Sequence, residues 1–282
     1  MIIDFHTHIF PPQFRNARQE LFAGEKAFEI LYNSPQAKLV GAEDLLRNMD
    51  NEGIDRSVIF GFPWEKKDHF WRHNNYIIEA VQKYPDRLTG LCCFSPLAPD
   101  GPEEVKRCLE AGLSGVGELA VYGDGLTAGV TGAMKDVMAL CSQFDVPFLL
   151  HTNEPVGHNY PGKAPMTLAQ IYHFIKMYPL NRIILAHWGG GLLFYALMKK
   201  EVKEVLKKVW FDTAASPYLY TPDIYRVAGE LIGFEKILFG SDYPLLKPSR
   251  YFKEMESANI SPHAMKQISG ANGAQFLGLR KK

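Results

Sequence analysis

Short apolar runs recur along this chain at regular intervals, and polar stretches with helical periodicity separate them. Several of the runs are continuously apolar and do not alternate with polar residues, which is typical of strands buried on both faces of a parallel sheet. The eight runs are IIDFH from Ile2, SVIFGF from Ser57, RLTGLCCF from Arg87, SGVGEL from Ser114, VPFLLH from Val146, RIILAH from Arg182, VWFDTAA from Val209 and KILFGSD from Lys236.

The stretches between the runs have polar and apolar faces that predict helices. They include AEDLLRNMDNEG, DHFWRHNNYIIEAVQKYP, GPEEVKRCLEAG, AMKDVMALCSQFD, MTLAQIYHFIKMYP and LLFYALMKKEVKEVLKK. Strand and helix alternating eight times predict an α/β fold of the (β/α)8 TIM barrel type. A doubly wound open sheet is the alternative, because a sequence does not show whether a sheet closes. We find no linker, repeat or low-complexity tract, so we expect one domain over residues 1–282.

Composition and charge restrict the class of protein. The chain is 46% hydrophobic and 22% charged, which is enough apolar material for a large core. Lys plus Arg and Asp plus Glu number 31 each, so no overall basic field attracts nucleic acid or an anionic membrane. No run reaches the ~18 apolar residues that a membrane span needs, and the first residues lack a basic signal region. We therefore expect a cytoplasmic protein.

The four cysteines do not form a zinc or disulfide pattern. They are Cys92, Cys93, Cys108 and Cys141, and none has C-x-x-C spacing. We expect reduced, buried thiols.

Residues of the types that bind divalent metal ions stand at the carboxyl ends of five of the eight runs. They are His6, His8, Glu118, His151, His187 and Asp242. In a strand, His6 and His8 point to the same side about 6.6 Å apart, near enough for both imidazoles to bind one ion. Each residue alone is more often a core or capping group. Because a barrel places its site at the carboxyl ends of its strands, the joint pattern predicts a metal site there.

The expected ligands are imidazoles and carboxylates without thiolates. Zinc is the expected ion, as one or two ions, and Mn, Fe or Ni would suit the same ligands. Such an ion would activate water for attack on a small molecule. In that hypothesis Asp242 is the general base and His187 stabilises the developing oxyanion. Asp4 shares the face of the two histidines and is a candidate partner for their other ring nitrogens.

Two long segments are candidates for substrate contacts, residues 9–42 and residues 153–165. In the second, His158, Tyr160 and Lys163 could meet an anionic or hydrogen-bonding group, and the alternative is a solvated loop held by its own hydrogen bonds. Trp188 and Tyr243 adjoin His187 and Asp242, so they are further candidates for substrate binding. Packing against the core is their alternative role.

Four motifs together resemble the metal-dependent hydrolases of the amidohydrolase superfamily. The motifs are IDFHTH, LLHTNEP, LAHWGGG and LFGSDYP, and they resemble in particular the amidohydrolase-2 group, which contains aminocarboxymuconate-semialdehyde decarboxylase-like enzymes. The resemblance implies a barrel with a mono- or binuclear metal centre. It implies that His6, His8 and Asp242 hold the first ion and that His151 is a further ligand. His187 would hold a second ion or orient the attacking water.

Glu118 favours one activity within that superfamily. The segment GVGELAVYGDG is similar to the fourth strand of TatD-like hydrolases, in which a Glu bridges two metals. Decarboxylating members usually lack this carboxylate and hold their acidic substrates with arginines, whereas residues 21–46 and 183–225 contain none. The sequence therefore predicts a metal-dependent hydrolase acting on a C–O or C–N bond of a small molecule.

Other functions remain open. The first alternative is a non-oxidative decarboxylase (lyase) of an unsaturated or aromatic acid. A TatD-type nuclease is less favoured, because phosphate binding normally needs clustered Lys and Arg. A non-catalytic barrel would leave the converging polar groups without a role. A homodimer is compatible with a barrel of this size.

Overall fold

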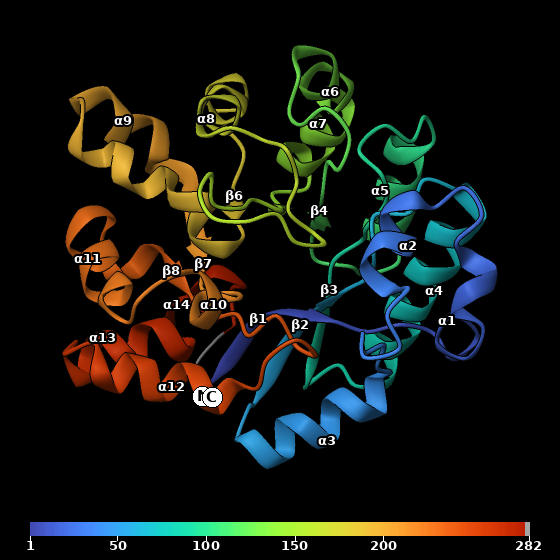
Figure 1. Cartoon of the computed structure of the whole chain (residues 1–282), viewed down its shortest axis with the longest axis horizontal. Coiled ribbons are helices and arrows are strands. Elements are labelled where there is room, and N and C mark those ends of the chain that lie inside the picture. The colour runs from blue at the N-terminus through green and yellow to red at the C-terminus, as the bar shows by residue number, and fades with distance from the viewer. Residues whose placement is uncertain (280–282) are drawn as a thin grey trace.

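Eight short strands form the centre of the molecule in the computed structural model, which describes residues 1–279 (Figure 1). Each strand lies within or overlaps one of the eight predicted runs. The strands are β1 (Ile3–His8), β2 (Arg56–Phe60), β3 (Leu88–Gly90), β4 (Val116–Leu119), β5 (Phe148–Leu150), β6 (Ile183–Leu185), β7 (Val209–Asp212) and β8 (Ile237–Leu238).

The strands follow one another in chain order around a closed parallel ring. The ladders run β1-β2-β3 and β4-β5-β6-β7-β8, and a bridge between Cys92 and Val116 joins the two sets. On the other side, the Phe5 amide donates to the Phe239 carbonyl at 2.7 Å, and Thr7 pairs with Tyr243. The fold is therefore the predicted (β/α)8 barrel, and the doubly wound alternative is excluded because the ring closes.

Helices surround the strands (Figure 1). The α-helices are α1 (Pro12–Asn16), α2 (Lys26–Tyr32), α3 (Ala42–Glu52), α4 (Lys67–Lys83), α5 (Gly101–Glu110), α6 (Ala128–Ala133), α7 (Lys135–Gln143), α8 (Leu168–Met177), α9 (Lys200–Val205), α10 (Ser216–Leu219), α11 (Asp223–Ile232), α12 (Pro248–Ser257), α13 (Pro262–Lys266) and α14 (Asn272–Phe276). Shorter segments are η1 (Arg18–Leu21), η2 (His187–Leu197), η3 (Leu206–Lys208), η4 (Phe234–Lys236) and the π-helical η5 (Gln267–Ala271). No helix of residues 1–279 is long and apolar enough to cross a membrane.

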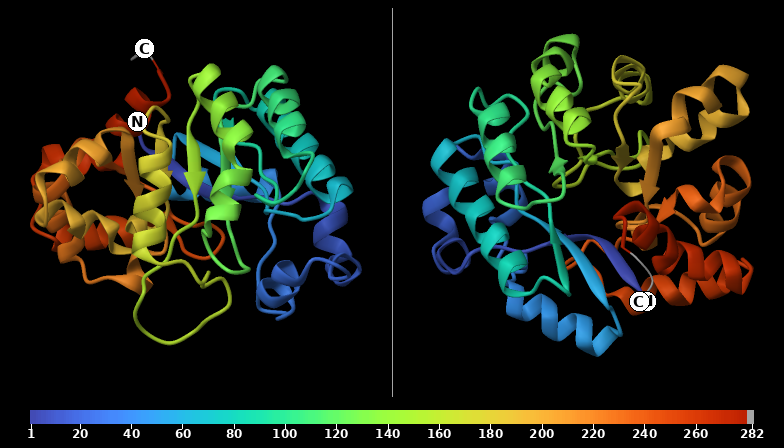
Figure 2. Two further views of the ribbon diagram at one scale, coloured as in Figure 1. Left: turned by 90° about the horizontal axis from the view of Figure 1, so that it is seen from above. Right: turned by 180° about the vertical axis from the view of Figure 1, so that it is seen from behind.

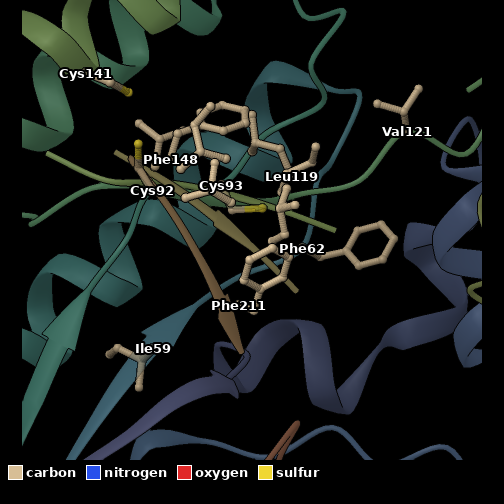
Figure 3. Close-up of a cluster of buried hydrophobic side chains, with 14 of the residues drawn as sticks. Ile59, Phe62, Cys92, Cys93, Leu119, Val121, Cys141, Phe148 and Phe211 are labelled. Carbon is tan, nitrogen blue, oxygen red and sulfur yellow. The ribbon is translucent and has the colours of Figure 1, made fainter. Parts of the chain in front are cut away.

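Both faces of the strands are buried, which explains their continuous apolar sequences. On β2, Val58 and Phe60 belong to one apolar cluster, whereas Ile59 between them belongs to a second, larger cluster. Figure 3 shows part of the larger cluster, in which Phe148 lies beside the buried thiols of Cys92 and Cys93. All four cysteines are free and buried, as expected.

The two long segments lie at the same end of the barrel. In Figure 2 the loop after β5 extends from the end of the barrel opposite to the chain termini, and the short helices of residues 9–42 lie toward that end. The predicted helix over residues 192–208 is not continuous. Residues up to Leu197 belong to η2, and α9 begins only at Lys200. Four successive residues from Trp188 to Gly191 have positive φ, and this turn starts a 3₁₀ segment in place of an α-helix.

Candidate metal centre

The predicted metal-binding side chains converge at the carboxyl ends of the strands. His6 and His8 lie on β1 and Glu118 on β4, while the other three directly follow strands or lie a few residues beyond them. Two groups of three could each hold an ion, and Glu118 belongs to both: His6, His8 and Glu118, and Glu118, His151 and His187. The structure thus brings together residues that are separated by up to 236 positions in the chain.

The first donor set faces one carboxylate oxygen of Glu118 and one of Asp242. His6 Nε2 lies 3.6 Å from Glu118 Oε2 and 3.6 Å from Asp242 Oδ1. His8 Nε2 lies 3.8 Å and 3.5 Å from the same two atoms. These separations are too long for hydrogen bonds. His6 Nε2 is buried and has no hydrogen-bond partner among the described residues, so this nitrogen is available to an ion.

The second donor set faces the other oxygen of Glu118. His151 Nδ1 lies 2.9 Å from Glu118 Oε1, and His187 Nε2 lies 3.4 Å from that oxygen. The two imidazole nitrogens are 3.3 Å apart. Glu118 therefore separates two adjacent groups of donor atoms, one on each of its oxygens.

Hydrogen bonds on the outer side of each ring fix which nitrogen points inward. His8 Nδ1, His151 Nε2 and His187 Nδ1 lie 3.2, 3.0 and 3.0 Å from main-chain carbonyl oxygens. A carbonyl oxygen only accepts, so each of these nitrogens carries the proton. In the neutral rings the inner nitrogens then present lone pairs toward carboxylate oxygens. Lone pairs and carboxylates facing one another suit a cation, so the donor set fits a divalent metal ion.

The electrostatics of the cluster support the same conclusion. Burial lowers the pKa of His187, but hydrogen bonding to Glu118 and the charges of Glu118 and Asp242 outweigh it and raise the pKa to about 9. Burial raises the pKa of Asp242, but the nearby imidazoles of His8, His6 and His187 outweigh this effect and lower the pKa to about 2. The carboxylates are therefore ionised at neutral pH, and an ion that binds here displaces protons from imidazoles.

Asp212, at the carboxyl end of β7, is a candidate site residue that the sequence interpretation missed. Its Oδ2 lies 2.8 Å from His6 Nδ1, and its Oδ1 accepts from the amides of His187 and Ala214 at 2.9 and 3.0 Å. Asp4, the predicted partner of the rings, instead accepts from the Ser241 amide and hydroxyl and from the His6 amide. In the run VWFDTAA an acidic residue directly follows the apolar part, and this signal could have identified Asp212.

The glycines after His187 allow the chain to pass close to the loop after β5. Gly190 has φ of +60°, and a Cβ atom there would lie 2.3 Å from the Asn153 carbonyl oxygen. His187 itself has φ of 55°. Close approach of the main chain explains this glycine run.

Aromatic side chains lie next to the donor atoms, and the sequence interpretation did not name them. Phe62 lies between Tyr32 and Tyr122, with ring centroids 6.0 and 6.4 Å apart, and it is stacked parallel to Tyr122. Tyr122 in turn lies 6.0 Å from the His151 ring. Burial raises the pKa of both tyrosines, and the charges of Glu118 and Asp242 raise it further. We call Tyr32, Phe62 and Tyr122 the aromatic wall.

Two of the predicted substrate-binding residues lie away from the donor set. Trp188 is fully buried, packs edge-on against Tyr225 and donates from Nε1 to the Ser216 hydroxyl at 3.0 Å. Its role is core packing. Tyr243 lines a separate surface pocket together with Asp44 and Arg47 of α3.

The other three predicted substrate-binding residues lie in the loop after β5, which is held by its own contacts. The Tyr160 hydroxyl donates to Glu154 Oε2 at 2.9 Å, and Lys163 Nζ lies 3.0 Å from Glu154 Oε1. His158 is exposed, and its carbonyl accepts from Lys163 at 3.4 Å. Burial raises the pKa of Tyr160, and the contact with Glu154 and the charge of Asp242 raise it further.

Comparisons with known proteins identify relatives along nearly the whole chain. The family model described as Amidohydrolase matches residues 3–279. A 2-amino-3-carboxymuconate-6-semialdehyde decarboxylase from Dictyostelium discoideum is 21% identical, with 98% of this chain and 91% of the relative covered. A gamma-resorcylate decarboxylase from Rhodococcus jostii is 24% identical, with 86% of this chain and 90% of the relative covered.

A solved structure supports the fold. A dihydroxybenzoic acid decarboxylase from a Polaromonas species, crystallised with manganese and the inhibitor 2-nitroresorcinol, superposes with a TM-score of 0.71. It is 19% identical and covers 100% of this chain and 98% of its own.

These comparisons correct the predicted activity. The two relatives above are decarboxylases, so the prediction of a hydrolase is wrong and the alternative reaction is the one supported. The error came from reading Glu118 as the mark of a hydrolase and the missing arginines as evidence against decarboxylation. Zinc is not specifically supported either, because the similar structure contains manganese.

Proposed function

We propose, from the premise that this chain belongs to the amidohydrolase family, that it is a metal-dependent, non-oxidative decarboxylase of small aromatic carboxylic acids. One observation of the structure carries the proposal. The aromatic wall lies beside the donor set: the Tyr122 ring is stacked on Phe62 and lies 6.0 Å from the ring of His151, so the surroundings of the imidazole and carboxylate groups suit a flat aromatic substrate. The reactions of the relatives support the same chemistry.

The residues that would hold the ion are His6, His8, Glu118 and Asp242. The Nε2 atom of each histidine lies 3.5–3.8 Å from Oε2 of Glu118 and from Oδ1 of Asp242. A bound divalent ion supplies positive charge that attracts the oxygen atoms of an acidic substrate. We propose manganese as the first ion to test, because a similar structure contains it. His151 and His187 lie on the other oxygen of Glu118 and face the substrate or a second ion.

The reaction breaks the bond between a ring carbon and its carboxylate, and a proton takes the place of the carbon dioxide. His187 is the proposed donor of that proton. Its Nδ1 is held by the Ala214 carbonyl, so the inner Nε2 faces the centre of the site, and the neighbouring carboxylates favour the protonated ring. Asp242, with a pKa of about 2, stays ionised and remains a ligand.

The test is product analysis on protein reconstituted with Mn²⁺. We expect stoichiometric carbon dioxide and the decarboxylated ring from at least one hydroxybenzoic acid in a panel that includes 2,6-dihydroxybenzoate and 2-hydroxybenzoate. Phenyl esters and anilides serve as hydrolase substrates in the same panel. If the protein holds its ion and cleaves the esters but releases carbon dioxide from no acid in the panel, the proposal is refuted.

His187→Gln separates the proton donor from the ligands. We expect carbon dioxide release to fall by about 10²–10⁴-fold, the usual contribution of a positioned acid, while the manganese content stays unchanged. His263→Gln on exposed α13 makes the same chemical change far from the site and should leave the rate unaltered.

A further inference from the structure

The loop after β5 contacts α2 across the barrel end. Gly162 lies against Leu31, because a Cβ atom at Gly162 would lie 3.2 Å from Leu31 Cδ2. α2 belongs to the segment that follows β1, and β1 and β5 lie on opposite sides of the eight-stranded ring. The contact therefore bridges the end of the barrel at which the donor set lies, the end from which this loop extends in Figure 2.

Gly162 also contacts the donor set itself. Its carbonyl oxygen accepts from His151 Nε2 at 3.0 Å, while the inner Nδ1 of the same ring lies 2.9 Å from Glu118 Oε1. The side chains of the six donor residues are only 0–15% exposed. An aromatic ring is much larger than a water molecule, so an aromatic acid reaches donor groups this little exposed when a segment above them moves.

The loop is built to move as one unit. Its two ends are joined by Asn153, whose side chain donates to the Ala164 carbonyl at 3.0 Å and accepts from the Ala164 amide at 2.7 Å. Within the loop, Glu154 accepts from the Tyr160 hydroxyl at 2.9 Å and lies 3.0 Å from Lys163 Nζ. Residues 155–159 are exposed. Close ends and internal contacts are typical of an Ω-loop, which moves on its ends without unfolding.

The surroundings favour movement of the loop and not of α2. A hollow of about 530 Å³ lies between the loop, the start of α8 and Tyr195 of η2, so the loop has space into which it can be displaced. On α2, Phe28 is fully buried, and Glu25 directly before the helix accepts from two amides at the start of α4. The helix is therefore a fixed edge against which the loop closes.

We propose that residues 154–163 form a movable cover over the donor set. The cover closes when Gly162 packs against Leu31, and in the closed position the Gly162 carbonyl orients the His151 ring. Gly162 is thus a positioning residue that couples closure to the donor set. The inference rests on the proposed function for the ligand that the cover admits, and it goes further by assigning how the site opens.

The rates of ligand binding test the cover. Association and dissociation of 2-hydroxybenzoate are measured by stopped-flow fluorescence on Mn²⁺-loaded wild type and Gly162→Ala. Gly162 has φ of +94°, and an alanine there would also press on Leu31, so the closed position is weakened. Because the cover opens for entry and for exit, we expect both rate constants to rise by about 10-fold while the dissociation constant stays within a few-fold.

A merely structural role of Gly162 would give a different result. A loosened site would raise the dissociation rate and the dissociation constant together and leave the association rate unchanged, and that outcome would overturn the inference. Gly157→Ala is the matched control, because Gly157 also has a positive φ, +82°, but a Cβ atom there meets nothing within 4 Å. Its rates should equal those of the wild type.

Leu31→Ala keeps the test decisive if Gly162→Ala does not fold. It removes the same contact from the side of α2 and leaves the loop sequence intact. We expect both rate constants to rise here as well, and unchanged rates in the folded variant would overturn the inference.

A measurement without ligand or metal tests the link to His151. In ¹H–¹⁵N NMR of metal-free protein labelled with ¹⁵N in its histidines, the Nε2 proton of His151 should be protected from exchange with water in wild type and in Gly157→Ala. The signal is assigned by its absence in His151→Gln. We expect this proton to exchange much faster in Gly162→Ala, and equal protection there would refute the positioning role of Gly162.

These measurements separate the inference from the proposed function. If the rates and the exchange change as expected but no acid of the panel releases carbon dioxide, the cover stands and the proposed reaction fails. If carbon dioxide forms but neither the binding rates nor the exchange respond to Gly162→Ala, the reaction stands and the cover fails. Should 2-hydroxybenzoate not bind, the exchange of the His151 proton decides the inference alone.

Discussion

At the scale of single residues, Asp212 shows how the fold orients a candidate metal ligand, the imidazole of His6. Its Oδ2 holds the Nδ1 of buried His6, and its Oδ1 holds the amide that begins the turn at His187. One carboxylate thus orients side chains from β1 and from the end of β6. This arrangement sets His6 Nε2 toward the donor set before any ion arrives.

Asp212→Asn should weaken metal binding without abolishing the fold. The amide cannot supply acceptors on both sides, so either His6 or the His187 amide loses its partner. We expect the affinity for Mn²⁺ to fall by about 10–100-fold, measured by competition with a chelating dye. Asp223→Asn at the start of α11 makes the same change on an exposed residue and should have no effect. Unchanged affinity in Asp212→Asn would remove this residue from the account of the site.

His73 predicts a specific pH dependence of stability. It is fully buried, its Nδ1 accepts from Trp64 Nε1 at 2.8 Å, and its Nε2 donates to the Ile9 carbonyl at 2.7 Å. Burial lowers its pKa from 6.5 to about 3. The folded protein therefore keeps the ring neutral, while the unfolded chain takes up a proton below pH about 6.5, so this contribution to stability is present above that pH and lost as the pH falls.

Urea unfolding of metal-free protein at pH 7, 6 and 5 measures the effect. Below pH 6 the free energy of unfolding should fall by about 1.4 kcal/mol per pH unit on account of His73 alone. In His73→Gln the free energy of unfolding should fall less steeply with pH, by about 1.4 kcal/mol per pH unit less than in the wild type. In His263→Gln it should fall as steeply as in the wild type. Parallel curves for wild type and His73→Gln would contradict the assignment.

At the scale of elements, a buried carboxylate connects the segment after β1 to the start of α4. Glu25 is 2% exposed and accepts from the amides of Glu65 and Lys66 at 2.9 Å each. His69 Nδ1 lies 2.9 Å from the same carboxylate. Because Glu25 directly precedes α2, which ends at Tyr32, this contact positions one residue of the aromatic wall.

Glu25→Ala leaves these donors without an acceptor. We expect the free energy of unfolding to fall by about 2–4 kcal/mol. The dissociation constant for 2-hydroxybenzoate should rise, because the α2 segment loosens, while Mn²⁺ affinity stays near that of the wild type. Glu29→Ala, exposed on the same helix, is the control. A loss of Mn²⁺ affinity as large as the loss of ligand binding would show that Glu25 supports the whole barrel end instead.

The strands could be predicted from the sequence, and the segments between them only in part. Continuous apolar runs identified all eight strands because burial on both faces leaves no other pattern. The stretch from Leu192 to Lys208 was predicted as one helix, but the positive-φ turn before it and the break before α9 depend on contacts with the loop after β5. Such contacts are long-range and leave no local periodicity.

The same limit applies to the candidate site. The imidazole and carboxylate donors could be predicted because each follows an apolar run, and a barrel brings strand ends together. The aromatic wall could not, because Tyr32 ends α2 while Phe62 and Tyr122 follow β2 and β4, and packing sets the paths of these three segments. Trp188 was named instead because it adjoins His187, yet its backbone directs it into the core.

At the scale of the whole molecule, the donor set specifies a metal-dependent barrel but not its reaction. The same imidazoles and carboxylates suit hydrolysis and decarboxylation, so the choice between them came from relatives along the chain and not from the ligands. The single domain, the cytoplasmic location and the homodimer stay predictions from the sequence.

Removing the ion should destabilise the whole barrel, because its ligands come from strands on opposite sides of the ring. Mn²⁺ at 100 times its dissociation constant should add about 2.7 kcal/mol of stability, which raises the unfolding temperature of a chain of this size by about 5–10 °C. Differential scanning calorimetry with chelator and with Mn²⁺ measures the shift. The His6→Ala, His8→Ala double variant should show little or no shift, and a full shift in that variant would place the ion elsewhere.

The most direct test of the central claim follows the carboxylate carbon itself. Mn²⁺-loaded protein is incubated in D₂O with 2,6-dihydroxybenzoate or 2-hydroxybenzoate labelled with ¹³C in the carboxylate, and the reaction is observed by NMR. We predict ¹³C-labelled carbon dioxide and bicarbonate, with one deuterium on the ring carbon that lost the carboxylate. His187→Gln should form both products much more slowly than the wild type. Labelled carboxylate that remains on the ring in both acids, while the protein holds its ion and binds the ligand, would contradict the account.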